Sequence, residues 1–323
     1  MFSLEYIYTL IILMGSGFLY RRFIDKYDND DLREYKLIKK YLLSDSSIAK
    51  SNKPILWIHI PYEINSRSWE SFSSRNTNNL NQPYLYLTIE SIIKTCGNSF
   101  KVCLIDDNSF SNLIPGWTIE LNKVGSPMKE KIRELAIAKL IYNYGGMIVP
   151  KSFLCFKDLI NIYNDYSKDD KMFAFENICK NTTDLDFIPD NTFYGACKNN
   201  TILNSYCSFL EILISKDYTD QSTFLSETRK WLYNETFNTR RINAINGKMI
   251  GIKDKNNRPV LIDHLFEENF NDFHPSICGL HIDDVELLKR TKYNWFCYLH
   301  ESKILTDCNN TLGKLFIKSK NNY

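Results

Sequence analysis

The chain has 323 residues, of which 44% are hydrophobic, and its 40 basic and 38 acidic residues give a formal net charge of +2. This length and composition are sufficient for a large core in one α/β domain, or in one domain with an appendage. The near-neutral charge is mixed along the chain and excludes the strongly basic balance that is typical of nucleic-acid-binding proteins, so we expect no nucleic-acid partner.

An uncharged stretch near the N-terminus, residues 6–20, differs from the polar body, and Arg21 and Arg22 follow it. A spanning helix needs about 20 apolar residues, which this stretch approaches once Phe2–Leu4 are included. We predict a hydrophobic helix that anchors the chain in a membrane over residues 1–22, with a buried first helix of the body as the alternative. A stem over 23–52 and a body over 53–323 follow.

The side of the membrane follows from charge. Positive residues lie after the apolar stretch, so the positive-inside rule places the body in the cytosol of a single-pass protein, or in the equivalent position at a virion membrane. Nine scattered cysteines without a Cys-x-x-Cys pair are typical of reduced core cysteines. Four Asn-x-Ser/Thr sequons point to the other side, but chance explains that number in so Asn-rich a chain.

The first part of the body predicts a βαβ unit. Residues 55–60 are almost continuously apolar and precede Pro61, as in a strand that is buried on both faces. A helix over 83–96 and a strand over 100–105 follow, and crossovers of this kind build right-handed parallel units. Between them, residues 62–81 are expected to form a lid or a disordered loop.

Three polar side chains lie at the ends of these two strands. In open α/β sheets ligands bind beyond the carboxyl ends of the strands. His59 is therefore a candidate contact for a nucleotide, with a core histidine as the alternative. Asp106 and Asp107 are candidates for contact with a nucleobase or ribose, and the alternative is a cap for a helix that begins at Ser109.

The central stretch, residues 129–156, predicts a helix that leads directly into a buried strand. Apolar residues recur at three- and four-residue spacing up to Tyr144, and Gly145 and Gly146 end the helix. The apolar run Met147–Val149 then reads as a short strand.

This stretch resembles the centre of the DXD-type glycosyltransferases, the family that includes yeast mannosyltransferases and bacterial capsular polysaccharide synthesis proteins. Tyr142, Tyr144, Gly145 and Gly146 match its Tyr-x-Tyr-Gly-Gly pattern, and Glu134 stands where the family has an aspartate. The resemblance implies a GT-A-like fold (nucleotide-diphospho-sugar transferase), an α/β structure with a Rossmann-like mixed sheet flanked by helices. It also implies a nucleotide-sugar site that includes Glu134 and the two glycines.

This chain lacks the two metal-binding aspartates of the family. The register from the glycines puts Pro150 and Ser152 there, with Lys151 between them. Hard cations prefer anionic oxygen ligands, so we expect no divalent metal at this position and no certain cofactor. The family's arginine position is Ile137, and Arg133 lies one turn earlier. Lys151 and Arg133 are candidate phosphate contacts, because cationic side chains bind phosphate oxygens.

The second half of the body contributes one candidate for catalysis. A strand is predicted over 171–176, and Glu176 at its end is the best-placed carboxylate for a general base. The aromatic run 293–299 is interpreted mainly as core. We also predict a solvated loop over 177–191, helices over 202–214, 224–237 and 283–289, and short strands over 248–252 and 259–262.

Two functions of different classes follow. The first is a glycosyltransferase-like protein that binds a nucleotide sugar and a glycan acceptor and is either metal-independent or inactive. The second is a non-catalytic, membrane-anchored structural, virion or interaction protein on the same scaffold. The whole chain also resembles proteins of large DNA viruses, for which the second function fits. A third possibility is that the body serves an unrelated function, because fold does not fix function.

Overall fold

The structure is a computed structural model, and it describes residues 53–61, 82–180, 185–216 and 221–321. The predicted anchor (1–22) and stem (23–52) and the predicted loop 62–81 lie outside these residues. Among the helices within the described ranges, none combines the length and the apolar character that crossing a membrane requires.

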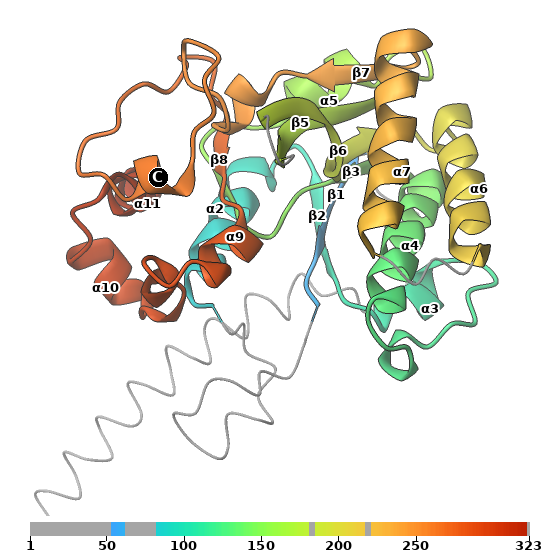
Figure 1. The fold of residues 1–323 in the computed structure, drawn as a ribbon, viewed down its shortest axis with the longest axis horizontal. Helices are drawn as coiled ribbons and strands as arrows, with labels where there is room; N and C mark the ends of the chain where they lie inside the picture. Colours follow the sequence, from blue (N-terminus) through green and yellow to red (C-terminus); the bar gives the residue numbers. More distant parts are fainter. Residues whose placement is uncertain (1–52, 62–81, 181–184, 217–220, 322–323) are drawn as a thin grey trace, which may run out of the picture. The chain divides into compact units, whose positions relative to one another are not determined.

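A mixed six-stranded sheet lies at the centre of the body, with the strand order β2-β1-β3-β6-β5-β7 (Figure 1). β1 pairs in parallel with β2 and with β3, and β5 pairs in parallel with β7, whereas β6 runs antiparallel to both β3 and β5. A second sheet pairs β4 with β8. The strands are β1 Ile55–His59, β2 Lys101–Ile105, β3 Gly146–Ile148, β4 Phe153–Cys155, β5 Met172–Lys180, β6 Leu185–Ala196, β7 Ile242–Ile245 and β8 Gly279–His281.

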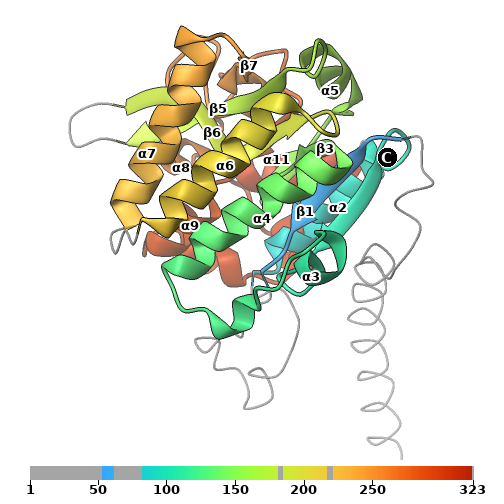
Figure 2. The ribbon, with the colours of Figure 1, turned by 90° about the vertical axis from the view of Figure 1, so that its right-hand side faces the viewer.

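Helices cover both faces of the large sheet. Figure 2 shows α4, α6 and α7 side by side on one face, and in Figure 1 α2 and the C-terminal helices lie on the other side. The α-helices are α2 Tyr84–Cys96, α3 Ser109–Leu113, α4 Met128–Tyr144, α5 Ile160–Tyr166, α6 Thr201–Ser215, α7 Gln221–Tyr233, α8 Ile262–Leu265, α9 Asp284–Lys289, α10 Glu301–Thr306 and α11 Thr311–Asn321. Short helical turns are η3 Leu121–Lys123, η4 Asn234–Asn238, η5 Gly247–Ile250 and η6 Asn294–Tyr298.

Two hydrophobic clusters follow from these layers. One packs α4, α6 and α7 against the sheet around Trp57, Leu140 and Tyr206. The other joins α2, the small sheet and the C-terminal helices around Tyr84 and Phe296. All nine cysteines are free thiols, and all except Cys197 are buried. The predicted mixed α/β sheet flanked by helices is confirmed, and reduced core cysteines fit it.

The junction between α4 and β3 depends on its two glycines. Gly145 has a φ of 74° and Gly146 a φ of 100°, values that L side chains rarely adopt. A Cβ on Gly146 would lie 2.1 Å from the Ile55 carbonyl oxygen, so only glycine lets β3 approach β1. The indole of Trp57 donates to the Gly145 carbonyl (3.0 Å) and closes the junction.

Two of the predictions for the second half are wrong. The predicted loop 177–191 contains the end of β5 and the start of β6. The sequence gives no sign of these parts of the strands, because polar side chains such as Asn177 interrupt the alternation of apolar residues. The predicted strands 248–252 and 259–262 are replaced by η5, α8 and an isolated bridge. The interpretation of the aromatic run as core holds for Tyr293, Phe296 and Cys297, which are buried in the second hydrophobic cluster. Trp295 and Tyr298 are 45% and 51% exposed, since only one side of η6 packs on α2.

Candidate functional site

The ends of three neighbouring parallel strands bring the polar candidates together. β1, β2 and β3 end at one edge of the sheet, where His59 is the last residue of β1, and Asp107 and Lys151 follow β2 and β3. α4 runs antiparallel to β3, so its first half, with Arg133 and Glu134, lies at the same edge. We call this end of β1, β2 and β3, with these five residues, the carboxyl edge.

A chain of hydrogen bonds joins three of these residues. Arg133 donates from Nε and an Nη to the two carboxylate oxygens of Asp107, at 2.8 and 2.7 Å. Asp107 Oδ1 also lies 3.0 Å from His59 Nε2. The three side chains are only 11–18% exposed. This arrangement is the Arg133–Asp107–His59 chain.

Burial and charge act in opposite directions within this chain. Burial disfavours the ionised form of Asp107, but the hydrogen bonds from His59 and Arg133 and the charge of the Arg133 guanidinium outweigh it and hold the pKa of Asp107 well below its usual range. Burial lowers the pKa of His59, and the opposing effect of Asp107 offsets this only in part. At neutral pH the chain therefore contains a carboxylate, a guanidinium and a neutral imidazole.

The two adjacent aspartates have different roles. Asp106 Oδ1 accepts from the backbone N–H (2.8 Å) and the hydroxyl (2.6 Å) of Ser109 and so caps the start of α3. Asp107 instead turns toward α4 and His59. The interpretation as a helix cap therefore holds for Asp106, while contact of Asp107 with a nucleobase or ribose stays a prediction.

Lys151 follows β3, and its charge acts on the His59 imidazole. Its Nζ forms an ion pair with Asp284 at the start of α9 (3.2 Å). The sequence pattern gave no indication of this partner, because 133 positions separate the two residues and contact between them depends on how β4 and β8 pair. Of the two cationic candidates at the carboxyl edge, each therefore has a carboxylate partner.

Glu134 faces away from this chain, into the layer between α4 and α6. The hydroxyl of Tyr206 donates to Glu134 Oε1 (2.5 Å), and the Asn191 side chain also hydrogen-bonds to it. Burial raises the pKa of Glu134 to about 7, against the effect of these two hydrogen bonds and with support from the charge of Asp190. Glu134 is therefore a carboxyl group that exchanges its proton near neutral pH.

The remaining candidates lie elsewhere. Gly145 and Gly146 lie at the amino end of β3, opposite Lys151, where they serve backbone packing. Glu176 lies in β5 and forms an ion pair with Lys253 (2.5 Å), while the Gly247 N–H donates to the same oxygen (2.8 Å). The structure does not bring these three candidates together with the Arg133–Asp107–His59 chain.

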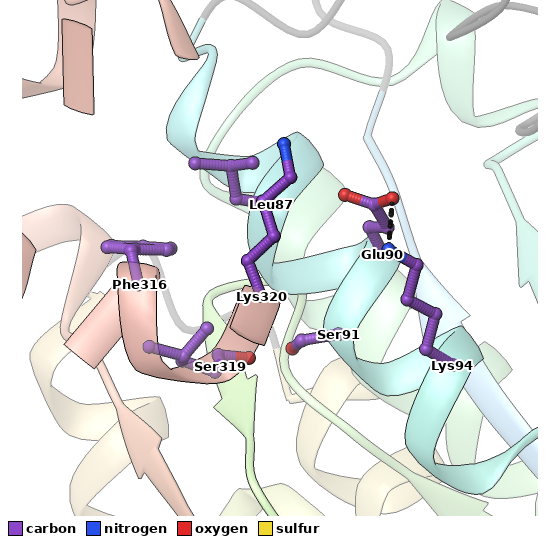
Figure 3. Close-up of a pocket in the computed structure, with 8 residues that line it drawn as sticks. Leu87, Glu90, Ser91, Lys94, Phe316, Ser319 and Lys320 are labelled. Carbon is purple, nitrogen blue, oxygen red and sulfur yellow. Dashed lines mark ion pairs between the residues drawn. The ribbon is translucent and has the colours of Figure 1, made fainter. Parts of the chain in front are cut away.

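A small pocket lies outside the carboxyl edge, between α2 and α11 (Figure 3). It is lined by Leu87, Ser91, Phe316, Ser319 and neighbouring residues, with an ion pair between Glu90 and Lys94 (2.8 Å). None of the predicted site residues lines it. In the part of the chain that the structure describes, no group of three or more His, Cys, Asp or Glu side chains is arranged to hold a metal ion.

Comparisons with known proteins give a structural likeness but no match in sequence. No sequence-family model matches the chain, and no curated protein matches it. Among solved structures, the chain is similar to the apo structure of the WbbM bifunctional glycosyltransferase, with a TM-score of 0.40 and 12% sequence identity. The match covers 86% of this chain and 50% of that one, so this chain spans about half the length of that protein.

Proposed function

We propose that this is a glycosyltransferase-like protein that binds a nucleotide sugar at the carboxyl edge, without a metal held by paired aspartates. One observation carries the proposal: His59, Asp107, Arg133 and Lys151 converge where three parallel strands end. This is the position at which open α/β sheets bind ligands. The residue types match the parts of such a ligand, since carboxylate and imidazole groups bind hydroxyl or N–H groups and cations bind phosphate.

To bind the diphosphate, Lys151 or Arg133 has to exchange its carboxylate partner for a phosphate oxygen. Lys151 is paired with Asp284, and Arg133 with Asp107. The Lys151 pair is the more exposed of the two and is a single contact, whereas the Arg133 pair is bidentate and more buried. We therefore assign the phosphate to Lys151, which exchanges Asp284 for a phosphate oxygen. An ion pair that solvent reaches contributes on the order of 1 kcal/mol, and the new bond to a phosphate oxygen offsets its loss.

Catalytic turnover is a weaker part of the proposal. A transferase has to stabilise the departing diphosphate and, for inversion, to deprotonate the acceptor. Glu176, the candidate base, is held in an ion pair with Lys253. Binding of the donor is the part that the geometry supports, and the glycan acceptor belongs to the proposal without a site assigned to it.

The test is ligand-dependent stabilisation of the full chain by UDP- and GDP-sugars, with and without manganese. A site on the native state adds about 2.7 kcal/mol to the free energy of unfolding at a ligand concentration 100 times Kd. We expect a metal-independent rise in melting temperature that Lys151→Met abolishes. Lys168→Met is the control for the loss of a lysine charge, because Lys168 forms an ion pair with Asp165 (3.0 Å) that is more exposed and lies outside the carboxyl edge. Absence of any rise with every nucleotide sugar contradicts the proposal.

A second candidate function is the non-catalytic, membrane-anchored structural or interaction protein. It is favoured by the internal ion pairs of Arg133, Lys151 and Glu176, which satisfy these charges without a ligand. Its anchor rests on residues 1–22. Flotation with lipid vesicles tests it: the full chain is expected to float and a chain without residues 1–22 to remain in the dense fraction, and equal behaviour of the two contradicts the anchor.

A further inference from the structure

The geometry of the Arg133–Asp107–His59 chain determines which nitrogen of His59 carries hydrogen. The pKa of Asp107 lies well below its usual range, so Asp107 is a carboxylate and offers only acceptor atoms. The hydrogen in the 3.0 Å contact between Asp107 Oδ1 and His59 Nε2 therefore belongs to Nε2. A neutral imidazole has a single N–H, so Nδ1 carries a lone pair.

The surroundings hold the imidazole in this state. The ring stacks on Phe110 with 5.5 Å between centroids and 15° between planes, which fixes its orientation. Asp107, Arg133 and Lys151 are the charged groups that act on it, and burial keeps its pKa below the usual value. Within the described residues, no protein group forms a hydrogen bond with Nδ1.

Arg133 has a positioning role in this arrangement. It occupies both oxygens of Asp107 with two N–H groups, so the carboxylate cannot rotate away from His59 or take up a proton. The bidentate geometry is specific to a guanidinium, and a lysine in its place supplies a charge without the planar fork.

We infer that Arg133 and Asp107 fix His59 as a hydrogen-bond acceptor at Nδ1, so that the ligand group at this position is a neutral N–H or O–H donor and not a phosphate. A base imide and a ribose hydroxyl both have this chemistry. A phosphate at neutral pH presents acceptors and negative charge, which the Nδ1 lone pair and the nearby Asp107 oppose. The identity of the ligand, but not the tautomer, rests on the proposed function.

The tautomer is measured by long-range ¹H–¹⁵N correlation spectra of the full chain labelled with ¹⁵N-histidine. The spectra distinguish the two neutral tautomers, and His59→Asn assigns the His59 signals by their loss. We expect the Nε2–H form at pH 7. An Nδ1–H form, or an even mixture, overturns the inference without any variant being needed.

Two matched substitutions test the positioning role. Asp107→Asn supplies an amide that both donates and accepts, so we expect a mixture of His59 tautomers. Asp106→Asn is the control, because Asp106 bonds Ser109 and not His59, and it should leave the Nε2–H form unchanged. An unchanged tautomer in folded Asp107→Asn shows that Asp107 does not set it and overturns the role of the pair.

The ligand is tested with UDP, its N3-methyl analogue and its 2′-deoxy analogue. We expect UDP to shift the Nδ1 resonance, and the analogue that lacks the bonded hydrogen to bind about tenfold more weakly, as the loss of one hydrogen bond implies. UDP that binds and leaves the Nδ1 resonance in place overturns the acceptor role. Absence of binding by every nucleotide contradicts the proposed function, whereas the tautomer still decides the first half of the inference.

Discussion

The glycine at the start of β3 allows a quantitative test of the fold. In Gly146→Ala, the new Cβ would lie 2.1 Å from the Ile55 carbonyl oxygen, which belongs to the backbone of β1 and has no rotamer with which to move away. A φ of 100° adds strain of about 1–3 kcal/mol for a residue with a Cβ. Overpacking adds about 1–3 kcal/mol. We therefore expect the variant to lose about 2–6 kcal/mol of unfolding free energy.

Gly116 separates the two contributions. Its φ of 73° is also positive, but a Cβ there would meet nothing within 4 Å. Gly116→Ala should therefore lose only the conformational part, about 1 kcal/mol. The assay is the midpoint and slope of urea unfolding of the full chain and both variants. If Gly146→Ala and Gly116→Ala lose the same free energy, the close contact between β3 and β1 is not as described and the reasoning fails.

Two further predictions concern buried carboxylates. In the folded chain the pKa of Glu134 is raised from its usual 4.5 to about 7, so the folded state holds a proton that the unfolded state has released. The unfolding free energy of the wild type relative to Glu134→Gln should fall as pH rises from about 4.5 to about 7 and then level off, and a flat difference in urea unfolding from pH 5 to 8 would contradict this. Glu176→Gln and Lys253→Met should each destabilise the fold by about 3 kcal/mol, because each leaves the other member of a buried ion pair unpaired. The double variant should lose less than the sum, and thermal unfolding of all three measures it; additive losses would show that the two side chains are not coupled.

The parts of the fold that the sequence predicts well are those whose burial leaves a local pattern. β1 and β2 are short apolar runs because both of their faces are covered, and α4 ends where its two glycines permit the turn into β3. The first part of β5 is predicted by the strand over 171–176, but the outer half of the β5–β6 hairpin is not, because it carries polar side chains. One of them, Asn177, bonds Asp190 across the strands (2.8 Å). The periodicity of apolar residues reflects which side chains are buried, so it does not detect strand residues whose side chains are polar and only partly buried.

The candidate site, too, has features that the sequence predicts and features that depend on tertiary packing. The sequence predicts that His59 and Asp107 lie at the same edge of the sheet, because each stands at the end of a predicted strand and parallel strands place their carboxyl ends together. Asp284 and Tyr206, the partners of Lys151 and Glu134, follow only from tertiary packing of distant segments. The local pattern therefore indicated which groups reach the carboxyl edge but not which of them were already paired, and the pairing decides how much charge is available to a ligand.

The segment that follows β3, residues 150–152, is held by backbone hydrogen bonds, which determine what it can offer to a ligand. The Pro150 carbonyl accepts from Phe153 N–H (3.0 Å), Thr88 Oγ1 donates to the Lys151 carbonyl (2.6 Å), and Ile282 N–H donates to the Ser152 carbonyl (3.2 Å). The backbone is thus bonded to its own turn, to α2 and to the end of β8, and the Ser152 side chain is only 1% exposed. A carboxylate at position 152 would be buried there at a cost of several kcal/mol. The charge that this segment brings to the carboxyl edge is that of Lys151, and an anionic ligand bound to it has to displace Asp284.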